Sequence, residues 1–583
     1  MGTPRWVVAD FSTARGADGR GALRRRRFAP NLRESDVDKE PLVTLDPSIH
    51  VAADSLVRRA TPAAAPAGSI ARTSPIDLRS LEPVPSSTPE EIGRAVARAR
   101  AAQELFRTRA FEERVDMLRR AAKAMLERRH EVMTLAREEM GKLEIEALFN
   151  EALGPLDVLN GWVSVVKKAA AREQVSLNPI AFPGKRAYID LVPRGVVGII
   201  APWNFPVSGL YRALYPALLL GNAIVLKPSE YTPRTSEWFV RMLQESLPAG
   251  VAQVVLGDGT VGAALIESGI DACVFTGSPR AGRAVRIACA ERGIPSSIEM
   301  GGKDCAIVLA DCDLVRTTAG ITHWALSNVG QSCGAIEVAL VEDSIANEVV
   351  ERLRGAWSRL RVGPAPYAEI APLANRRQLE IVEAHVKDAL DKGAKLVCGG
   401  RRTGEGLFYE PTVLDRCTDE MQVVTDETFG PVLAVVRVEG ASEAIRRVNR
   451  SRYGLGASIW TKDYARAERL ADRLDVGVVD VNNHSFTGAI AALPWSGTRE
   501  TGFGVANSHH ALSTFARPKA VVIDRGADPE PFWMPFDGAL FEMGNALCEA
   551  QQMRPESLLR AWKLPLLIRK RVQTVREFFA FRK

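Results

Sequence analysis

Cysteine and histidine are scarce in this sequence, and their spacing excludes several common kinds of site. The 583 residues include eight cysteines and seven histidines. No two cysteines form a CxxC pair, and so few cysteines in so long a chain do not make a disulfide framework. The histidines show neither HExxH nor zinc-finger spacing, so no metal site is indicated.

Long apolar runs are missing as well. No run reaches the roughly 18 residues that a membrane-spanning helix requires. The basic run 24–27 is not followed by the apolar segment of a secretory signal. We therefore expect the protein in the reducing cytoplasm.

Excess charge is confined to the C-terminal end of the chain. The formal net charge is +6. Residues 551–583 alone hold nine Lys or Arg against two Glu, which makes +7. The rest of the chain is therefore nearly neutral, and we expect no nucleic-acid partner.

Length and composition indicate more than one domain, because 583 residues exceed what a single core accommodates. Residues 1–70 are rich in Arg, Ala, Asp, Pro and Gly without periodicity, which predicts a flexible extension. Residues 88–91, Thr-Pro-Glu-Glu, have the composition of a helix start. We expect three helices from there, the last ending at Gly141.

The sequence then alternates between short apolar runs and amphipathic segments. Such runs are typical of parallel strands, buried on both faces and joined by helical crossovers. The predicted strands of a first unit are 195–200, 223–227, 253–256 and 272–275. Those of a second unit are 306–309, 338–341, 432–436 and 457–460, with helices at 344–361 and 376–392. The sequence therefore predicts doubly wound α/β domains, which bind ligands beyond the carboxyl ends of their strands.

Several polar residues come directly after the strands of the first unit. Asn204 follows the first strand, and Lys227 with Glu230 follows the second. Ser278 begins the helix after the fourth strand. Because N–H groups at a helix start bind anions, segment 275–282 is a candidate phosphate site.

Gly257 opens a GxGxxG pattern between a predicted strand and a helix. The acidic residue that a dinucleotide fingerprint places about 20 positions later, at the end of the next strand, is missing. A plain tight turn therefore explains this pattern equally well.

A carboxylate and a cysteine stand 34 positions apart in glycine-rich surroundings: Glu299 in segment 299–303 and Cys333 in segment 330–334. A thiolate can form a covalent intermediate, and a carboxylate can activate the water that clears it. Taken alone, an inert buried cysteine and a solvated acid explain the pair more simply. The motifs around them carry the functional interpretation.

Taken together, these motifs resemble those of the aldehyde dehydrogenase superfamily, in the same order, over about residues 74–525. Three features depart from the common pattern: Pro279, Met300 and the pair 498–499, Thr-Arg, but none removes a catalytic group. The matching segments are PWNFP at 202–206, KPSE at 227–230, FTGS at 275–278, EMGGK at 299–303, GQSC at 330–333, ETFGP at 427–431, PWSG at 494–497 and TGFG at 501–504.

The resemblance implies an α/β fold with two doubly wound domains, one for the cofactor and one for catalysis, and a small β arm for oligomerisation. It also implies where the chain divides. The expected parts are a flexible extension at 1–70, an NAD-binding domain at 71–300 with the arm at about 182–195, a catalytic domain at 301–498, a return segment and oligomerisation strand at 499–525, and a basic amphipathic extension at 526–583.

The family's mechanism assigns three catalytic roles. Cys333 is expected to attack the aldehyde carbon as a thiolate. The Asn204 amide and the Cys333 backbone N–H are expected to hold the oxyanion. Glu299 is expected to deprotonate the water that releases the carboxylic acid.

The resemblance also assigns a cofactor site and implies the partners. NAD is expected because an acidic residue at position 230 repels a 2′-phosphate, although NADP is possible. The expected partners are a small-molecule aldehyde, which the sequence does not identify, and further copies of the chain in a dimer or tetramer. The expected cofactor-binding residues are Lys227, Glu230, Ser278, Gly277, Trp203, Glu427, Phe429 and Gly257.

Two other functions remain open. A CoA-acylating enzyme would release the thioester to CoA, but it does not need the water-activating Glu299. A catalytically silent scaffold would use the basic tail to bind a partner, but it has no need of Cys333 and Asn204.

The basic tail itself has two interpretations. Ile568, Val572, Val575 and Phe579 are spaced to lie on one face of a helix. A helix packed on the body or on a neighbouring subunit is the simpler expectation. The alternative is a helix on a membrane surface, which would make the protein peripheral to a membrane.

Overall fold

The computed structural model describes residues 68–179, 181–364, 368–552 and 562–580. The flexible extension expected at 1–70 lies outside the described residues, except for its last three. The described chain begins with two paired antiparallel strands, β1 (Ser69–Thr73) and β2 (Ser80–Pro85). Regular structure therefore begins slightly before the expected position 71.

The three expected helices follow as α2 (Pro89–Phe106), α3 (Phe111–Glu127) and α4 (Arg129–Met140). At the start of α2 the Thr88 hydroxyl accepts from the Glu91 N–H at 3.3 Å, and the Glu91 carboxylate accepts from the Thr88 N–H at 2.9 Å. This reciprocal cap satisfies two N–H groups that a helix start leaves free. Gly141 ends α4 with a left-handed φ of 71°, as glycine allows without strain.

The first sheet is parallel throughout and has the order β7-β6-β5-β8-β9. The chain winds to both sides of the starting strand β5, which makes the sheet doubly wound, as expected. Its strands are β5 (Val196–Ile200), β6 (Ala223–Lys227), β7 (Ala252–Val254), β8 (Ala272–Thr276) and β9 (Ser296–Glu299). Its helices are α7 (Tyr211–Leu219), α8 (Pro233–Gln244), α9 (Gly259–Glu267) and α10 (Pro279–Glu291), and α5 (Glu144–Ala147) and α6 (Pro155–Ala169) precede it.

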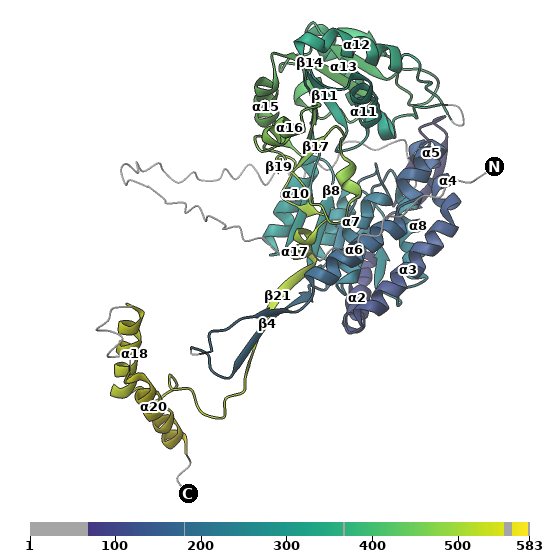
Figure 1. The fold of residues 1–583 in the computed structure, drawn as a ribbon. Helices are drawn as coiled ribbons and strands as arrows, with labels where there is room; N and C mark the ends of the chain where they lie inside the picture. Colours follow the sequence, from purple (N-terminus) through teal and green to yellow (C-terminus); the bar gives the residue numbers. More distant parts are fainter. Residues whose placement is uncertain (1–67, 180, 365–367, 553–561, 581–583) are drawn as a thin grey trace, which may run out of the picture. The chain divides into compact units, whose positions relative to one another are not determined.

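The second sheet has the order β12-β13-β14-β11-β10-β16-β17 and is parallel except for the edge strand β12. Figure 1 shows α11, α12 and α13 gathered around it. Its strands are β10 (Asp304–Val308), β11 (Ile336–Glu342), β12 (Lys395–Cys398), β13 (Thr412–Asp415), β14 (Val432–Val438), β16 (Gly456–Trp460) and β17 (Val478–Val481). Its helices are α11 (Leu314–Leu326), α12 (Asp343–Trp357), α13 (Arg376–Asp391), α14 (Gln422–Thr425), α15 (Ala441–Arg450) and α16 (Tyr464–Ala471). Helix α12 ends four residues before the expected 361.

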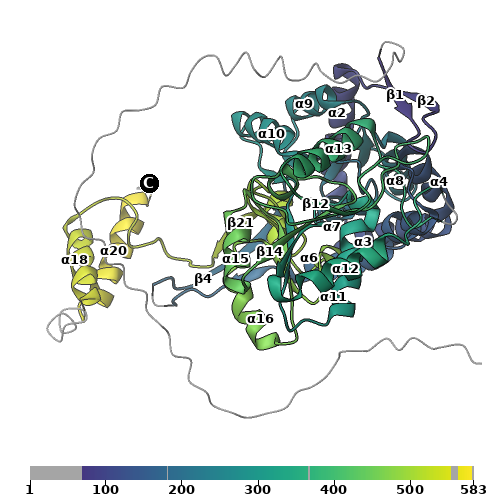
Figure 2. The same ribbon diagram turned by 90° about the horizontal axis from the view of Figure 1, so that it is seen from above.

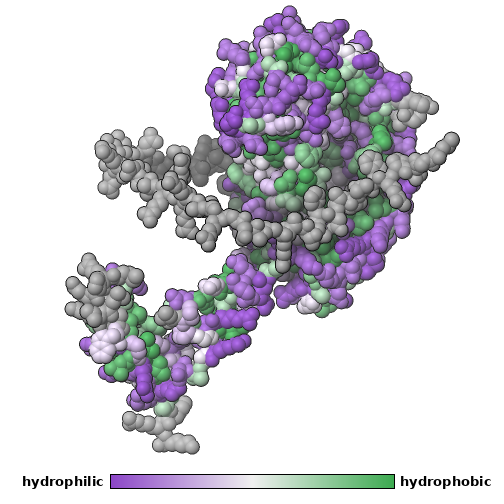
Figure 3. Space-filling view, viewed as in Figure 1, coloured by the Kyte–Doolittle hydropathy of each residue, from purple (hydrophilic) through white to green (hydrophobic). Residues whose placement is uncertain are grey.

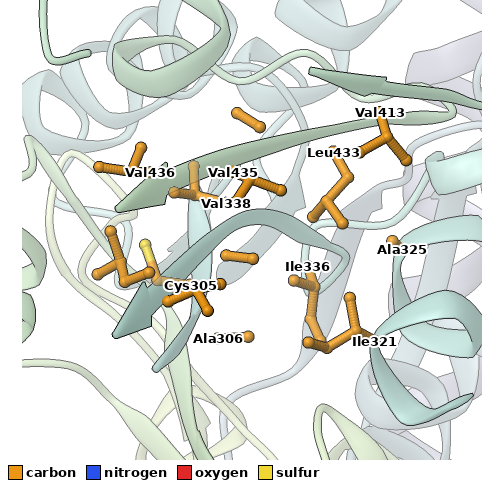
Figure 4. Close-up of a cluster of buried hydrophobic side chains, with 14 of the residues drawn as sticks. Cys305, Ala306, Ile321, Ala325, Ile336, Val338, Val413, Leu433, Val435 and Val436 are labelled. Atoms are coloured by element: carbon orange, nitrogen blue, oxygen red, sulfur yellow. The ribbon is translucent and has the colours of Figure 1, made fainter. Parts of the chain in front are cut away.

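Side chains of the central strands fill the core of this second unit. Figure 4 shows Ile336 and Val338 of β11 beside Leu433 and Val435 of β14, with Ile321 of α11 close by. All five are at most 2% exposed. Burial on both faces explains why these strands read as continuous apolar runs.

A return segment leads back from the second sheet to the first. It contains β18 (Trp495–Ser496), β19 (Thr498–Arg499), β20 (Val505–Ala506) and α17 (Leu512–Phe515). Strand β19 pairs with β15 (Tyr453–Gly454), which comes just before β16 in the chain. Strand β21 (Ala516–Asp524) then pairs along its whole length with β4 (Lys185–Pro193), which also pairs with β3 (Glu173–Val175). The expected arm and terminal strand are thus neighbours in one antiparallel sheet.

Two C-terminal helices, α18 (Gly538–Gln551) and α20 (Leu564–Phe579), lie side by side (Figures 1 and 2). Arg571 and Val575 of α20 are buried, whereas Ile568 is 40% and Phe579 63% exposed. Val575 belongs to the face expected from the spacing, and Val572 of that face is half-buried, so the middle of the expected face packs and its two ends do not. No helix among the described residues is long and apolar enough to cross a membrane.

Candidate active site

Cys333 follows a short, strained turn at Ser327–Gly330. Asn328 and Val329 have left-handed φ values of 54° and 61°, although neither is glycine. A β-branched residue in this conformation is unfavourable and persists only where its surroundings fix it. Both residues are at most 2% exposed, so the surrounding protein holds the turn that presents Cys333.

Asn204 is tied into this turn by hydrogen bonds. Its side-chain amide donates to the carbonyl of Gln331 at 3.1 Å, and the Asn328 amide donates to the carbonyls of Asn204 at 3.1 Å and Gln331 at 3.0 Å. An amide nitrogen carries two N–H groups. Asn204 therefore has a second donor besides the one that anchors it two residues from Cys333.

Glu299 ends β9, and its carboxyl group interacts electrostatically with the Cys333 thiol. Burial raises the pKa of Glu299 to about 7, against the opposing effects of the Arg212 guanidinium and a hydrogen bond with the Ala506 backbone. Burial, opposed by the charge of Arg212 and reinforced by that of Glu299, raises the pKa of Cys333 to about 12. Cys333 at rest is thus a protonated thiol under the electrostatic influence of a carboxyl group whose pKa suits proton exchange near neutrality.

Arg212, a residue for which the sequence analysis predicted no role, belongs to this site. It projects from the otherwise apolar helix α7, and its guanidinium lies 4.8 Å from the centre of the Trp495 ring. The Trp495 ring lies close to Gly334, the residue after Cys333. A Cβ atom added to Gly334 would be 2.8 Å from this ring. In the sequence, the signal for a role of Arg212 was its position as a single arginine within an otherwise apolar helix.

Glu427 lies over the glycine turn that follows Glu299. Its carboxylate accepts from the Gly302 N–H at 3.0 Å, and a side chain at Gly301 would overlap it. Burial raises the pKa of Glu427 to about 8, and the nearby Glu337 raises it too. Glycine at position 301 is required for this close approach of Glu427.

A buried ion pair fixes the segment that follows Glu427. Glu337 accepts from the N–H groups of Thr428 and Phe429, each at 2.8 Å, and pairs with Lys303. Phe429 has a left-handed φ of 53°, and its ring centre lies 5.4 Å from that of Trp203, edge to face. Glu337 was not among the predicted site residues, because its role appears only when β11 is placed beside this loop.

Lys227 and Glu230 lie together at the carboxyl end of β6. The ammonium and carboxylate groups are 3.7 Å apart, with side chains 5% and 39% exposed. Burial lowers the pKa of Lys227, against the opposing charges of Glu230 and Asp258. The buried Lys227 ammonium is a hydrogen-bond donor, and the accessible Glu230 carboxylate beside it is an acceptor. Together they suit the hydroxyl groups of a ribose.

Ser278 caps α10, and its hydroxyl accepts from the Ala281 N–H at 3.4 Å. The Gly277 N–H donates to the Glu299 carbonyl at 3.1 Å, so it is already used inside the protein. At Gly257 a side chain would overlap Val261, which is the tight-turn role considered above. Of these three residues, Ser278 stands at the start of a full-length helix, where an anion is favoured.

The comparison with known proteins decides the family. Residues 63–521 match the family described as the aldehyde dehydrogenase family. The chain belongs to the aldehyde dehydrogenase family. The resemblance stated from the motifs is thereby confirmed, and the match ends just before the C-terminal extension.

Named relatives of this aldehyde dehydrogenase have different substrates. The 4,4'-diapolycopene aldehyde oxidase of Methylomonas sp is 37% identical over 476 residues, which cover 81% of this chain and 89% of that protein. A putative NADP-dependent succinate-semialdehyde dehydrogenase of Mycolicibacterium smegmatis is 33% identical over 461 residues, which cover 78% and 88%.

Solved structures agree with the fold. One is the NADP-dependent glyceraldehyde-3-phosphate dehydrogenase of Bacillus halodurans in complex with NADP, 33% identical with a TM-score of 0.73 over 79% of this chain and 96% of that one. Another is a Mycobacterium tuberculosis aldehyde dehydrogenase with NAD+, 30% identical with a TM-score of 0.75 over 80% and 97%. The fold is that of the aldehyde dehydrogenases, and the protein is an NAD(P)-dependent oxidoreductase that oxidises an aldehyde to the acid.

Proposed function

We propose that this aldehyde dehydrogenase forms a thioester on Cys333 and hydrolyses it with Glu299. The supporting observation is the hydrogen bond from Asn204 to the turn that presents Cys333, together with the electrostatic effect on Cys333 of Glu299, whose pKa is raised to about 7. Cys333 Sγ bonds to the aldehyde carbon while its proton leaves towards Glu299. The Asn204 amide and the Cys333 backbone N–H stabilise the resulting oxyanion. Once the thioester has formed, Glu299 releases the proton from Cys333 to solvent and becomes a carboxylate again. It then takes a proton from water, which attacks the carbonyl carbon, and passes that proton to the departing Cys333 thiolate as the acid is released.

When bound, the dinucleotide accepts the hydride that converts the thiohemiacetal into the thioester. We assign its adenosine ribose to Lys227 and Glu230, and its pyrophosphate to the Ser278 helix start. Gly277 and Gly257 serve by keeping the adjoining turns tight. On the other side, Glu427 takes the nicotinamide ribose, and Phe429 and Trp203 border the nicotinamide ring. The carboxylate of Glu230 disfavours a 2′-phosphate, so NAD is the preferred form.

The test is the formation of NADH and NADPH with a panel of aldehydes, each with and without CoA. The panel includes succinate semialdehyde, glyceraldehyde 3-phosphate and an apolar polyene aldehyde, after the names of the relatives. We expect CoA-independent turnover that is lost in Cys333→Ala and kept in the control Cys548→Ala, which removes an exposed cysteine. Turnover that requires CoA favours the acylating alternative, and none with any aldehyde favours the scaffold.

We also propose the working form and location of the enzyme. The divisions at 71–300, 301–498, 499–525 and 526–583 separate cofactor binding, catalysis, the return segment and the extension. The β arm supports a homo-oligomer, a dimer or tetramer, because β21 lies at the edge of its sheet with exposed residues such as Val522. The compartment that we propose is the cytoplasm.

A further inference from the structure

The C-terminal extension carries an unusual share of exposed apolar side chains. The described chain has 27 large hydrophobic residues that are exposed, and ten of them fall within 532–579, so exposed apolar side chains are concentrated in the segment beyond the family match. Figure 3 shows apolar residues over these helices, mixed with hydrophilic ones. The ten are Phe532, Trp533, Met534, Phe536, Phe541, Trp562, Leu566, Ile568, Phe578 and Phe579, and we call them the apolar surface.

The helices α18 and α20, which carry five of these residues, have a small core of their own. Met543 of α18 is fully buried, and Val575 of α20 is 1% exposed. The buried Arg571 donates to the carbonyls of Pro531 at 3.1 Å and Trp533 at 2.6 Å, and its guanidinium pairs with Asp537 at 2.9 Å. These contacts fix the segment that carries the exposed aromatic rings.

Charge is divided within the extension. Three acidic residues near the start of the extension form ion pairs: Asp528 with Arg576, Asp537 with Arg571 and Glu530 with Lys185. The exposed cations Lys563, Arg569 and Lys570 have no ion pair within the described residues. They neighbour Trp562, Leu566 and Ile568 in the sequence. The acids Glu542 and Glu549 lie on α18, so the positive charge belongs to α20 and to the +7 of residues 551–583.

We propose that the extension 526–583 docks on the surface of an anionic lipid bilayer. Tryptophan and phenylalanine rings favour the boundary between headgroups and acyl chains, where their apolar area leaves water. Lysine and arginine beside them are attracted to lipid phosphates. Because no described helix could cross a membrane, the contact is at the surface. A second copy of the chain would require apolar contact but no excess of unpaired cations, and for that reason the lipid surface is the better match.

The test uses the full-length protein and vesicles of phosphatidylcholine, with and without phosphatidylglycerol. We expect co-sedimentation with the anionic vesicles at low salt and its loss at high salt, because salt screens charge. Arg569→Glu with Lys570→Glu is expected to lower the binding constant about tenfold or more. We expect the double variant Phe541→Ser with Phe579→Ser to abolish binding to the anionic vesicles, because it removes apolar area.

Matched controls change equally exposed residues outside the extension. Arg94→Glu with Lys123→Glu removes two exposed cations, and Leu105→Ser with Val315→Ser removes two exposed apolar residues, 75% and 67% exposed. We expect both controls to bind vesicles like the wild type. Turnover of a water-soluble aldehyde should be unchanged in all four variants, so this result does not depend on the proposed catalytic mechanism.

Three outcomes would overturn the proposal. Full-length protein that stays in solution with anionic vesicles excludes docking. Equal binding to neutral vesicles at any salt removes the role of the cations. A lower molecular mass of the Phe541/Phe579 variant in light scattering, without vesicle binding by the wild type, assigns the apolar surface to a neighbouring subunit instead.

Discussion

At the residue scale, the site depends on how burial and one arginine set the protonation of Glu299. Burial raises its pKa to about 7, and Arg212 limits the rise. A carboxyl group with its ordinary pKa would be ionised at neutral pH but would be too weak a base. A carboxyl group with a pKa far above neutrality would stay protonated at neutral pH. The balance leaves Glu299 able both to receive and to give a proton under physiological conditions.

This balance predicts the pH dependence of deacylation. Glu299 acts on water only as the carboxylate, so the rate of thioester hydrolysis should rise with pH through about 7 and level off above it. Glu299→Gln should remove this dependence and trap the thioester on Cys333, which intact-protein mass spectrometry detects. A mutant with a wild-type rate and no adduct would make Glu299 structural.

Arg212 predicts the direction in which that profile can be moved. Arg212→Met keeps an elongated side chain but removes the charge that lowers the pKa of Glu299 and Cys333. The midpoint of the deacylation profile should shift upwards, and single-turnover hydrolysis across pH measures it. Arg212→Lys should stay near the wild-type midpoint. An unshifted profile in Arg212→Met would exclude the electrostatic role.

Asn204 predicts a loss of rate rather than a shift with pH. Asn204→Ala removes one proposed oxyanion donor, and the acylation rate should fall by roughly 10²–10³. Pre-steady-state NADH formation measures this step. Asn160→Ala, which alters an exposed asparagine on α6, serves as the control. An unchanged acylation rate in Asn204→Ala would mean that other groups hold the oxyanion.

Cys333, Glu299 and Asn204 were predicted from the sequence because each lies within a short segment that matches a motif of the family. It could not predict Arg212, whose importance comes from where α7 places it and not from its neighbours in the chain. Glu337 was missed for a related reason. It is 91 residues from Thr428, and only the pairing of β11 with β14 brings the two together.

At the scale of elements, the buried pair Lys303–Glu337 links β11 to the loop after Glu427. The side chains are 1% and 3% exposed. Glu337 satisfies two backbone N–H groups of that loop, and Lys303 donates to the Thr428 hydroxyl at 3.2 Å. The positive φ of Phe429 is held by these bonds, so the pair stabilises both the fold and the proposed nicotinamide side of the site.

Glu337→Gln should therefore lower the free energy of unfolding by about 3–5 kcal/mol, because Lys303 is left buried without its partner. Urea denaturation measures the loss, and titration with NAD should show weaker binding. Glu348→Gln breaks an exposed pair with Arg352 and should cost at most about 1 kcal/mol. Equal losses in the two variants would show that the buried pair has no special role.

The elements themselves were largely predictable. Apolar runs predicted four of the five strands of the first sheet and four of the seven strands of the second, because strands buried on both faces need such runs. The strands β9, β12, β13 and β17 were not predicted. The packing face of α20 was only partly predictable: the spacing predicted Val575, which is buried, but not Arg571. An arginine becomes a buried residue only where partners such as Asp537 and the carbonyl of Pro531 are supplied by another segment.

At the scale of the whole molecule, the return segment completes the site. The Met300 N–H donates to the Thr501 carbonyl at 2.8 Å, and Glu299 forms an isolated β-bridge with Gly502. The same segment continues into β21, which pairs with β4. The chain that supports Glu299 is therefore continuous with the arm that we propose for oligomerisation.

The arm makes a prediction about assembly. β21 is at the edge of its sheet, and Val522 on it is 60% exposed. Val522→Asp adds a charge to this edge, and charged edge strands resist pairing. We expect a lower molecular mass by light scattering, with the unfolding temperature of the subunit preserved. Val315→Asp, on the exposed side of α11, should keep the wild-type mass. An unchanged mass in Val522→Asp would mean that the subunits associate through another surface.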